Sequence, residues 1–157
     1  MIQKDEYYIG SALEVARKAR RHGNHPFGAI LVGSDGAILL TAENTVITEK
    51  DCTGHAETNL MRKASRQFDR NFLLTCTLYT STEPCAMCSG AIYWGNVGRV
   101  VYGLGAESLH EMTGDDPENP TLALPCREVF SRGQRSIEVI GPVLEQEAQN
   151  VHEGFWR

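Results

Sequence analysis

Two short motifs in this chain bring together the residue types that hold a catalytic zinc ion. The first is His55-Ala56-Glu57, and the second is Pro84-Cys85-Ala86-Met87-Cys88. One imidazole and two thiols are ligands that Zn²⁺ prefers, and a catalytic zinc site uses three protein ligands and leaves its fourth position to water. Glu57 lies two residues beyond the histidine, close enough to transfer protons to and from that water. The spacing therefore predicts zinc-dependent hydrolytic chemistry.

The cysteine content favours metal binding over a disulfide framework. The chain has five cysteines, an odd number, which are Cys52, Cys76, Cys85, Cys88 and Cys126. The Cys85-x-x-Cys88 spacing also occurs in redox-active dithiols, but the histidine motif upstream favours a metal. A closed structural zinc site with Cys76 as its fourth ligand is the other alternative, and nothing in the pattern predicts that Cys76 points toward the site.

Composition limits the class of protein. A chain of 157 residues with 41% hydrophobic and 22% charged residues fits one globular domain over residues 1–157. The net charge of −5 disfavours non-specific binding to nucleic acid, although a local basic patch can coexist with it. The sequence has no apolar run long enough to span a membrane, and its start lacks the hydrophobic region of a signal peptide. We therefore expect a cytoplasmic protein with no membrane contact.

The two motifs must be positioned by elements that the sequence pattern also predicts. We expect helices over residues 4–22, 55–68, 86–94, 126–131 and 144–155. We expect strands over residues 27–32, 37–40, 75–80, 99–102 and 137–140. The turn Ser34-Asp35-Gly36 makes the first two strands a hairpin, and residues 43–54 form a loop that leads to the histidine.

These elements predict a three-layer α/β/α fold in which the ligands meet. Two strand–helix units place the starts of their helices at the same edge of the sheet, and each helix carries ligands in its first turn. The positive ends of both helix dipoles would favour thiolates there. More than 30 residues separate the fourth strand from the fifth, which suits a crossover to a parallel strand.

Over about residues 5–140 the chain resembles the cytidine-deaminase-like zinc deaminase superfamily, in the branch of guanine deaminases and tRNA adenosine deaminases. The motifs HAE and PCAMC carry this resemblance. It implies a five-stranded mixed sheet with helices on both faces, a homodimer, and hydrolytic deamination that releases ammonia. It also implies a role for six residues. His55, Cys85 and Cys88 would bind zinc, Glu57 would shuttle protons, Asn44 would hydrogen-bond the base or ribose, and the Ala56 N–H would donate to the ring carbonyl.

Four further segments bear on the substrate. The stretches Pro26-Phe27-Gly28-Ala29 and Ala91-Ile92-Tyr93-Trp94 resemble guanine deaminases, which makes Phe27 and Trp94 candidate stacking residues or else core aromatics. Asp115 and Asp116 resemble an acidic pair that could accept hydrogen bonds from a 2-amino group, or they are turn residues. Phe155 and Trp156 could close over the site of their own subunit or of a partner. We therefore expect guanine or a related small purine as substrate.

Other functions stay open. A tRNA wobble-adenosine deaminase would need a basic groove, for which the second helix offers Arg62, Lys63, Arg66 and Arg70. A cytosine, cytidine or other amino-azine deaminase is a third possibility. A non-catalytic base-binding module on the same scaffold would be a different class of protein. The presence of Glu57 argues against the last, because a binding scaffold has no need of a carboxylate beside the metal.

Overall fold

A computed structural model describes residues 2–156 of the protein, and its centre is a five-stranded mixed sheet. The strands are β1 (Gly28–Val32), β2 (Ile38–Glu43), β3 (Thr77–Thr82), β4 (Arg99–Leu104) and β5 (Glu138–Ile140), in the order β2-β1-β3-β4-β5. β1 is antiparallel to both β2 and β3, whereas β3, β4 and β5 are parallel to one another. The predicted hairpin and the parallel fifth strand are both confirmed.

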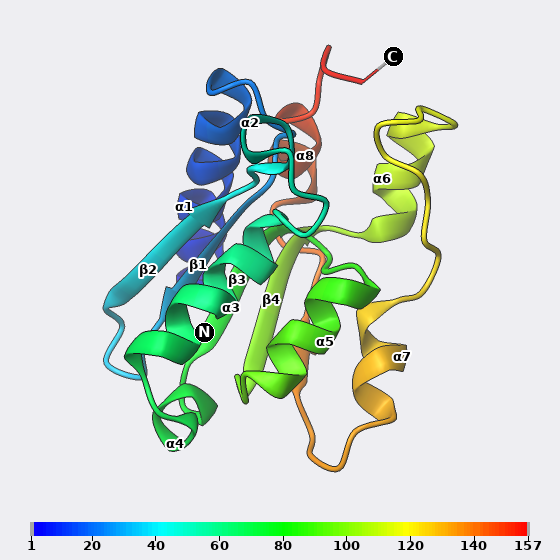
Figure 1. The fold of residues 1–157 in the computed structure, drawn as a ribbon. Coiled ribbons are helices and arrows are strands. Elements are labelled where there is room, and N and C mark those ends of the chain that lie inside the picture. The colour runs from blue at the N-terminus through cyan, green and yellow to red at the C-terminus, as the bar shows by residue number, and fades with distance from the viewer. Residues whose placement is uncertain (1, 157) are drawn as a thin grey trace.

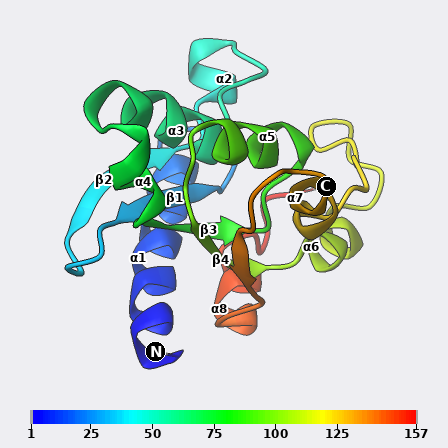
Figure 2. The ribbon, with the colours of Figure 1, turned by 90° about the horizontal axis from the view of Figure 1, so that it is seen from below.

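Helices cover both faces of the sheet (Figure 1), so the predicted three-layer architecture is confirmed. Figure 2 shows α1 (Ile2–Arg21) and α8 (Glu145–Asn150) on one face, with α3 (Ala56–Gln67) and α5 (Ala86–Trp94) on the other. The shorter helices are α2 (Val46–Glu49), α4 (Arg70–Leu74), α6 (Ala106–Thr113) and α7 (Cys126–Ser131). Within residues 2–156, no helix combines the length and the apolar character needed to cross a lipid bilayer.

Strand β1, which lies between β2 and β3, contributes side chains to the cores under both helical layers. Side chains alternate between the faces of a strand, so Ala29 and Leu31 join the core under α3, while Ile30 and Val32 join the core under α1. Every residue of β1 is buried, which makes apolar burial on both faces the main stabilising contribution. The first residue of the strand, Gly28, has no room for a side chain, because an added Cβ would clash with the backbone nitrogen of Ala16 in α1.

The structure differs from the predicted elements in four places, one of which is the five-residue helix α4, which follows the second predicted helix. The expected loop over residues 43–54 contains the four-residue helix α2, which is too short to give a periodic signal. The region 103–125, for which no element was predicted, contains α6. The closing helix α8 ends at Asn150, five residues earlier than predicted, and residues 151–156 leave it as an irregular tail with Gly154 at φ 74°. Glycine adopts this left-handed conformation without the steric cost that other residues bear.

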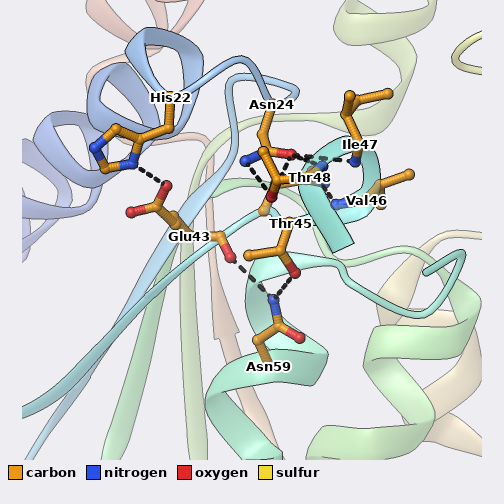
Figure 3. Close-up of polar contacts among 9 residues, drawn as sticks. His22, Asn24, Glu43, Thr45, Val46, Ile47, Thr48 and Asn59 are labelled. Carbon is orange, nitrogen blue, oxygen red and sulfur yellow. Dashed lines mark hydrogen bonds and ion pairs between the residues drawn. The ribbon is translucent and has the colours of Figure 1, made fainter. Parts of the chain in front are cut away.

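The segment that leads to His55 is fixed by side chains from other elements (Figure 3). The Asn24 side-chain oxygen accepts hydrogen bonds from the backbone N–H groups of Ile47 and Thr48, at 3.1 and 3.0 Å, at the start of α2. On α3, Asn59 donates through Nδ2 to the Glu43 carbonyl and to the Thr45 hydroxyl, each at 3.0 Å. The same Asn59 nitrogen lies 3.3 Å from the Gly54 carbonyl, so this loop is held at both ends before it reaches the histidine.

A buried ion pair joins α1 to the sheet on the opposite face. Asp5 accepts hydrogen bonds from Arg99 at 2.8 Å and from the Tyr79 hydroxyl at 2.7 Å. Burial by itself would raise the pKa of Asp5, but hydrogen bonds from Arg99 and Tyr79 and the positive charge of Arg99 outweigh it and lower the pKa below the usual 3.8. The carboxylate therefore stabilises the fold above pH 3.8, and this contribution is lost as the pH falls through the lower folded-state pKa.

We predict that Asp5→Asn lowers the free energy of unfolding at pH 7 by roughly 2 kcal/mol, because Arg99 loses a charged partner. Urea denaturation at pH 7 and at a series of pH values below 3.8 measures this difference, which should shrink as the wild-type carboxylate becomes protonated. Glu14→Gln is the control, since the Glu14–Arg17 pair is exposed and contributes about 0–0.5 kcal/mol. Equal losses in the two variants would contradict the assignment.

Candidate functional site

The three candidate ligands come from the starts of two helices. His55 is the residue that immediately precedes the first turn of α3, and Cys85 holds the same position before α5. Both have extended backbones, with ψ 147° and 176°, and neither side chain caps its own helix. Cys88 follows in the first turn of α5 and is fully buried. The side chains are therefore free to turn toward one another.

Their geometry fits a zinc ion. The ligand atoms of His55, Cys85 and Cys88 all lie within 4.8 Å of one another. His55 Nδ1 is 3.5 Å from Cys85 Sγ and 3.6 Å from Cys88 Sγ. Tetrahedral zinc with Zn–N of about 2.0–2.1 Å and Zn–S of about 2.3 Å requires an N–S separation of about 3.6 Å. Cys76 lies at the opposite end of β3, next to its first residue, and is not part of this group.

The electrostatics of the cluster favour metal ligation. Hydrogen bonds from Cys88 and His55, and the charge of His55, lower the pKa of Cys85 to about 4 against the effect of burial. The pKa of Cys88 is raised, chiefly by its hydrogen bond to Cys85 and by burial. Cys85 is therefore the more acidic of the two thiols, and its thiolate is the form that binds a divalent cation.

Glu57 lies in the first turn of α3 and is buried, with 6% of its surface exposed. Burial and the negative charge of Cys85 raise its pKa to about 7, while the positive charge of His55 and a hydrogen bond with Thr80 of β3 oppose this shift. A carboxyl group with a pKa near neutrality can both accept and release a proton under ordinary conditions.

Three other predicted residues lie at the same edge of the sheet. Asn44 follows β2, and its backbone N–H donates to the Phe27 carbonyl at 3.1 Å. The Asn44 side-chain oxygen accepts from the Val46 N–H at 3.0 Å, which leaves its NH₂ group as the part that can contact a ligand. Ala56 is the first residue of α3, where the backbone N–H has no partner within the helix. Phe27 stands immediately before β1.

The C-terminal residues pack against Phe27 within the same chain. The rings of His25, Phe27, His152, Phe155 and Trp156 contact one another at centroid distances of 4.8–6.5 Å. We refer to these five residues as the aromatic cluster. Arg20 of α1 fixes the tail by donating to the carbonyls of Val151 and Glu153. The tail therefore lies at the edge that Phe27 shares with Asn44.

The structure places Trp94 away from the metal centre of its own chain. Trp94 ends α5, nine residues after Cys85 and therefore roughly 13 Å along the helix axis. Its side chain is 76% exposed. A residue at the C-terminal end of this helix cannot contact a base bound at the N-terminal end.

The acidic pair falls into two environments. Asp115 is exposed, whereas Asp116 is buried and accepts a hydrogen bond from the Glu118 N–H at 2.9 Å, as expected of a turn residue. Glu118 reaches the aromatic cluster instead, with its carboxylate 3.1 Å from His25 Nε2. The sequence gives no local signal for Glu118, because its contact with His25 joins residues that are 93 positions apart.

Glu83 is a second residue that the sequence analysis did not identify. It precedes Pro84 and Cys85, and its two carboxylate oxygens accept from the Ala106 and Cys126 backbone N–H groups, each at 3.0 Å. These are the first residues of α6 and α7. One side chain thereby attaches the starts of α6 and α7 to the end of β3 that precedes the ligands, and between these two helices lies the loop over residues 114–125, which we call the acidic loop.

Comparison with known proteins agrees with this geometry. The family model of the cytidine and deoxycytidylate deaminase zinc-binding region matches residues 2–104, which include both motifs. The chain belongs to the cytidine and deoxycytidylate deaminase family. It is a hydrolytic deaminase that acts on a nucleobase or nucleoside, with zinc as its cofactor.

The proteins similar to this chain are named for different substrates. Over 157 aligned residues, 98% of this chain and 93% of the relative, the chain is 42% identical to a probable cytosine deaminase of Schizosaccharomyces pombe. It is 39% identical to a tRNA-specific adenosine deaminase of Buchnera aphidicola subsp. Schizaphis graminum, over 98% of this chain and 95% of that one. The solved guanine deaminase of Bacillus subtilis is 36% identical, with a TM-score of 0.62 over 76% of this chain and 82% of that structure.

We predict that Cys85→Ala abolishes stoichiometric zinc binding, because two protein ligands do not hold the ion in a site that uses three. Elemental analysis of the purified protein by mass spectrometry measures zinc per chain. Cys52→Ala is the matched control, since Cys52 is exposed and lies outside the ligand group, and it should retain one zinc. Full zinc content in Cys85→Ala would show that the ligand assignment is wrong.

Proposed function

We propose that this protein deaminates a small free nucleobase, with guanine as the first candidate. The observation that carries the proposal is the aromatic cluster, in which the chain's own C-terminal residues pack on Phe27 and His25, at the sheet edge where Phe27 is hydrogen-bonded to Asn44. A planar base can pack against the face or edge of such rings. The negative net charge supports the same choice over RNA.

In the proposed mechanism, His55, Cys85 and Cys88 hold a zinc ion, which supplies the Lewis acidity that makes a water molecule nucleophilic. Glu57 takes a proton from the attacking water as a C–O bond forms at the amino-bearing carbon, and gives it to the adjacent ring nitrogen. Glu57 then moves the remaining hydroxyl proton to the amino group. The C–N bond breaks, ammonia leaves, and the product carries a carbonyl in place of the amino group.

Three groups would orient the base. The NH₂ group of Asn44 and the backbone N–H of Ala56 are donors for oxygen or nitrogen acceptors on the ring, and Phe27 offers an aromatic face. The carboxylates of the acidic loop, Asp116 and Glu118, are acceptors that suit the several N–H groups of guanine. Cytosine is the second candidate, because the relative that aligns over nearly the whole chain is named a probable cytosine deaminase.

We predict that zinc-loaded protein releases ammonia from guanine or cytosine and not from an adenosine-34 tRNA anticodon stem-loop. Guanosine and adenosine complete the panel, and a coupled assay for ammonia gives the rates. Glu57→Gln should retain zinc and lower kcat by about 10²–10⁴-fold, because Glu57 carries both protons in the proposed mechanism. Turnover on the stem-loop alone would contradict the proposal, and so would full activity of Glu57→Gln.

We further propose that the protein forms a homodimer through the exposed side of α3 and α5. Trp94 lines a groove of ≈ 290 Å³ there, together with Met61, Arg62 and Ala91. A large aromatic side chain that is three-quarters exposed beside an apolar groove is typical of an interface residue.

We predict that Trp94→Asp converts the dimer into a monomer, because a charge in this groove would lose its hydration on association. Analytical ultracentrifugation of both proteins measures the change in mass. Tyr7→Asp is the control, since Tyr7 is also exposed but lies on α1, on the opposite face. A monomeric wild-type protein would contradict the dimer.

A further inference from the structure

His152 has its ring protons fixed by its neighbours. The indole Nε1–H of Trp156 donates to His152 Nδ1 at 3.0 Å. Indole nitrogen is a donor only, so Nδ1 must be the unprotonated, accepting nitrogen of the imidazole. Burial and the nearby charge of Arg20 lower the pKa of His152 to about 4, so the ring is neutral near pH 7. Its single proton is therefore on Nε2.

This Nε2–H group is a buried donor without a partner. His152 is 2% exposed. Among the side chains that the structure describes, two fully buried polar atoms have no hydrogen-bond partner, His152 Nε2 and Thr82 Oγ1. Leaving such a group unpaired costs about 1–3 kcal/mol, so both atoms are expected to contact something that is polar.

Both residues are neighbours of Phe27. The His152 ring contacts the Phe27 ring at a centroid distance of 5.3 Å. The antiparallel register pairs Ala29 with Thr80, and continuing it by two residues brings Phe27 opposite Thr82. Because side chains alternate along a strand, Thr82 shares a face with Thr80, whose hydroxyl contacts Glu57. Thr82 is also three residues before the ligand Cys85.

We infer that His152 is a specificity-determining residue, which donates a hydrogen bond through Nε2 to an acceptor atom of the substrate base. The acceptor is a ring carbonyl oxygen or an unprotonated ring nitrogen, and the Thr82 hydroxyl contacts the same base as donor or acceptor. Trp156 positions His152 by fixing its tautomer. This inference rests on the proposed function, because it names how the same site recognises its base.

The first test observes the Nε2–H group directly. Zinc-loaded Glu57→Gln protein, labelled with ¹⁵N-histidine, binds a base without consuming it. The imidazole ¹⁵N spectrum should show His152 protonated at Nε2, and saturation with guanine or cytosine should shift that proton and nitrogen. An Nδ1-protonated ring, or a signal that does not move when the base is saturating, would overturn the inference.

The second test uses matched variants. His152→Phe keeps an aromatic ring but removes the donor, and it should lower kcat/KM about tenfold, mainly through KM, with zinc content unchanged. His152→Gln restores an N–H donor and should recover part of the loss. Thr82→Val, which has the same shape without the hydroxyl, should also raise KM. Tyr7→Phe is the control, because Tyr7 is exposed on α1, and it should leave kcat/KM unchanged.

The outcomes separate this inference from the proposed function. If wild-type protein turns over a base while His152→Phe changes only thermal stability, the proposed function stands and His152 has a structural role, which overturns the inference. If wild-type protein neither binds nor turns over a free base, the proposed function fails and the inference fails with it. A raised KM in His152→Phe with recovery in His152→Gln supports both.

Discussion

The metal centre depends on two helices that begin at one edge of the sheet. β1 lies between β2 and β3 and is antiparallel to both, so β2 and β3 run in the same direction and end at the same edge. The chain leaves β2 toward α3 and leaves β3 toward α5. Each helix begins with its ligand already in place, and the positive ends of both dipoles face the sulfurs. Ligand positions and thiolate stabilisation therefore have the same structural origin.

A network of polar contacts fixes the segments around this edge. Asn24 and Asn59 hold the loop that leads from β2 to His55, with α2 formed within it. On the other side, Glu83 accepts hydrogen bonds from the starts of α6 and α7. Buried backbone donors at helix starts need such partners, and a carboxylate supplies two acceptors at once. The loops around the metal centre are thus attached to the helices and strands beside them.

The C-terminal tail adds an aromatic surface next to the polar chemistry. Arg20 binds the tail carbonyls, and the rings of the tail pack on His25 and Phe27. Within this surface, the Trp156 indole sets the tautomer of His152. The metal centre would be common to deaminases with different substrates. We therefore propose that the tail and the acidic loop determine which base binds. Similar proteins are named as deaminases of cytosine, guanine and tRNA adenosine. This agrees with a shared deamination reaction and a substrate-recognition surface that differs between them.

By itself, the sequence determined the elements and the chemistry of the ligands. Helix and strand periodicity is local, so α3, α5, the hairpin and the parallel fifth strand were predictable, as was the family from its two motifs. The tertiary structure decided what depends on contacts between distant residues. Trp94 lies away from the metal centre of its chain because it is at the C-terminal end of α5, whereas Cys85 precedes the N-terminal end. Glu118 contacts His25 although 93 residues of chain separate them. The buried Nε2–H of His152 likewise exists only in the folded state. The hydrogen bond from Trp156 places the proton on Nε2, and packing against Phe27 helps to exclude solvent from the ring.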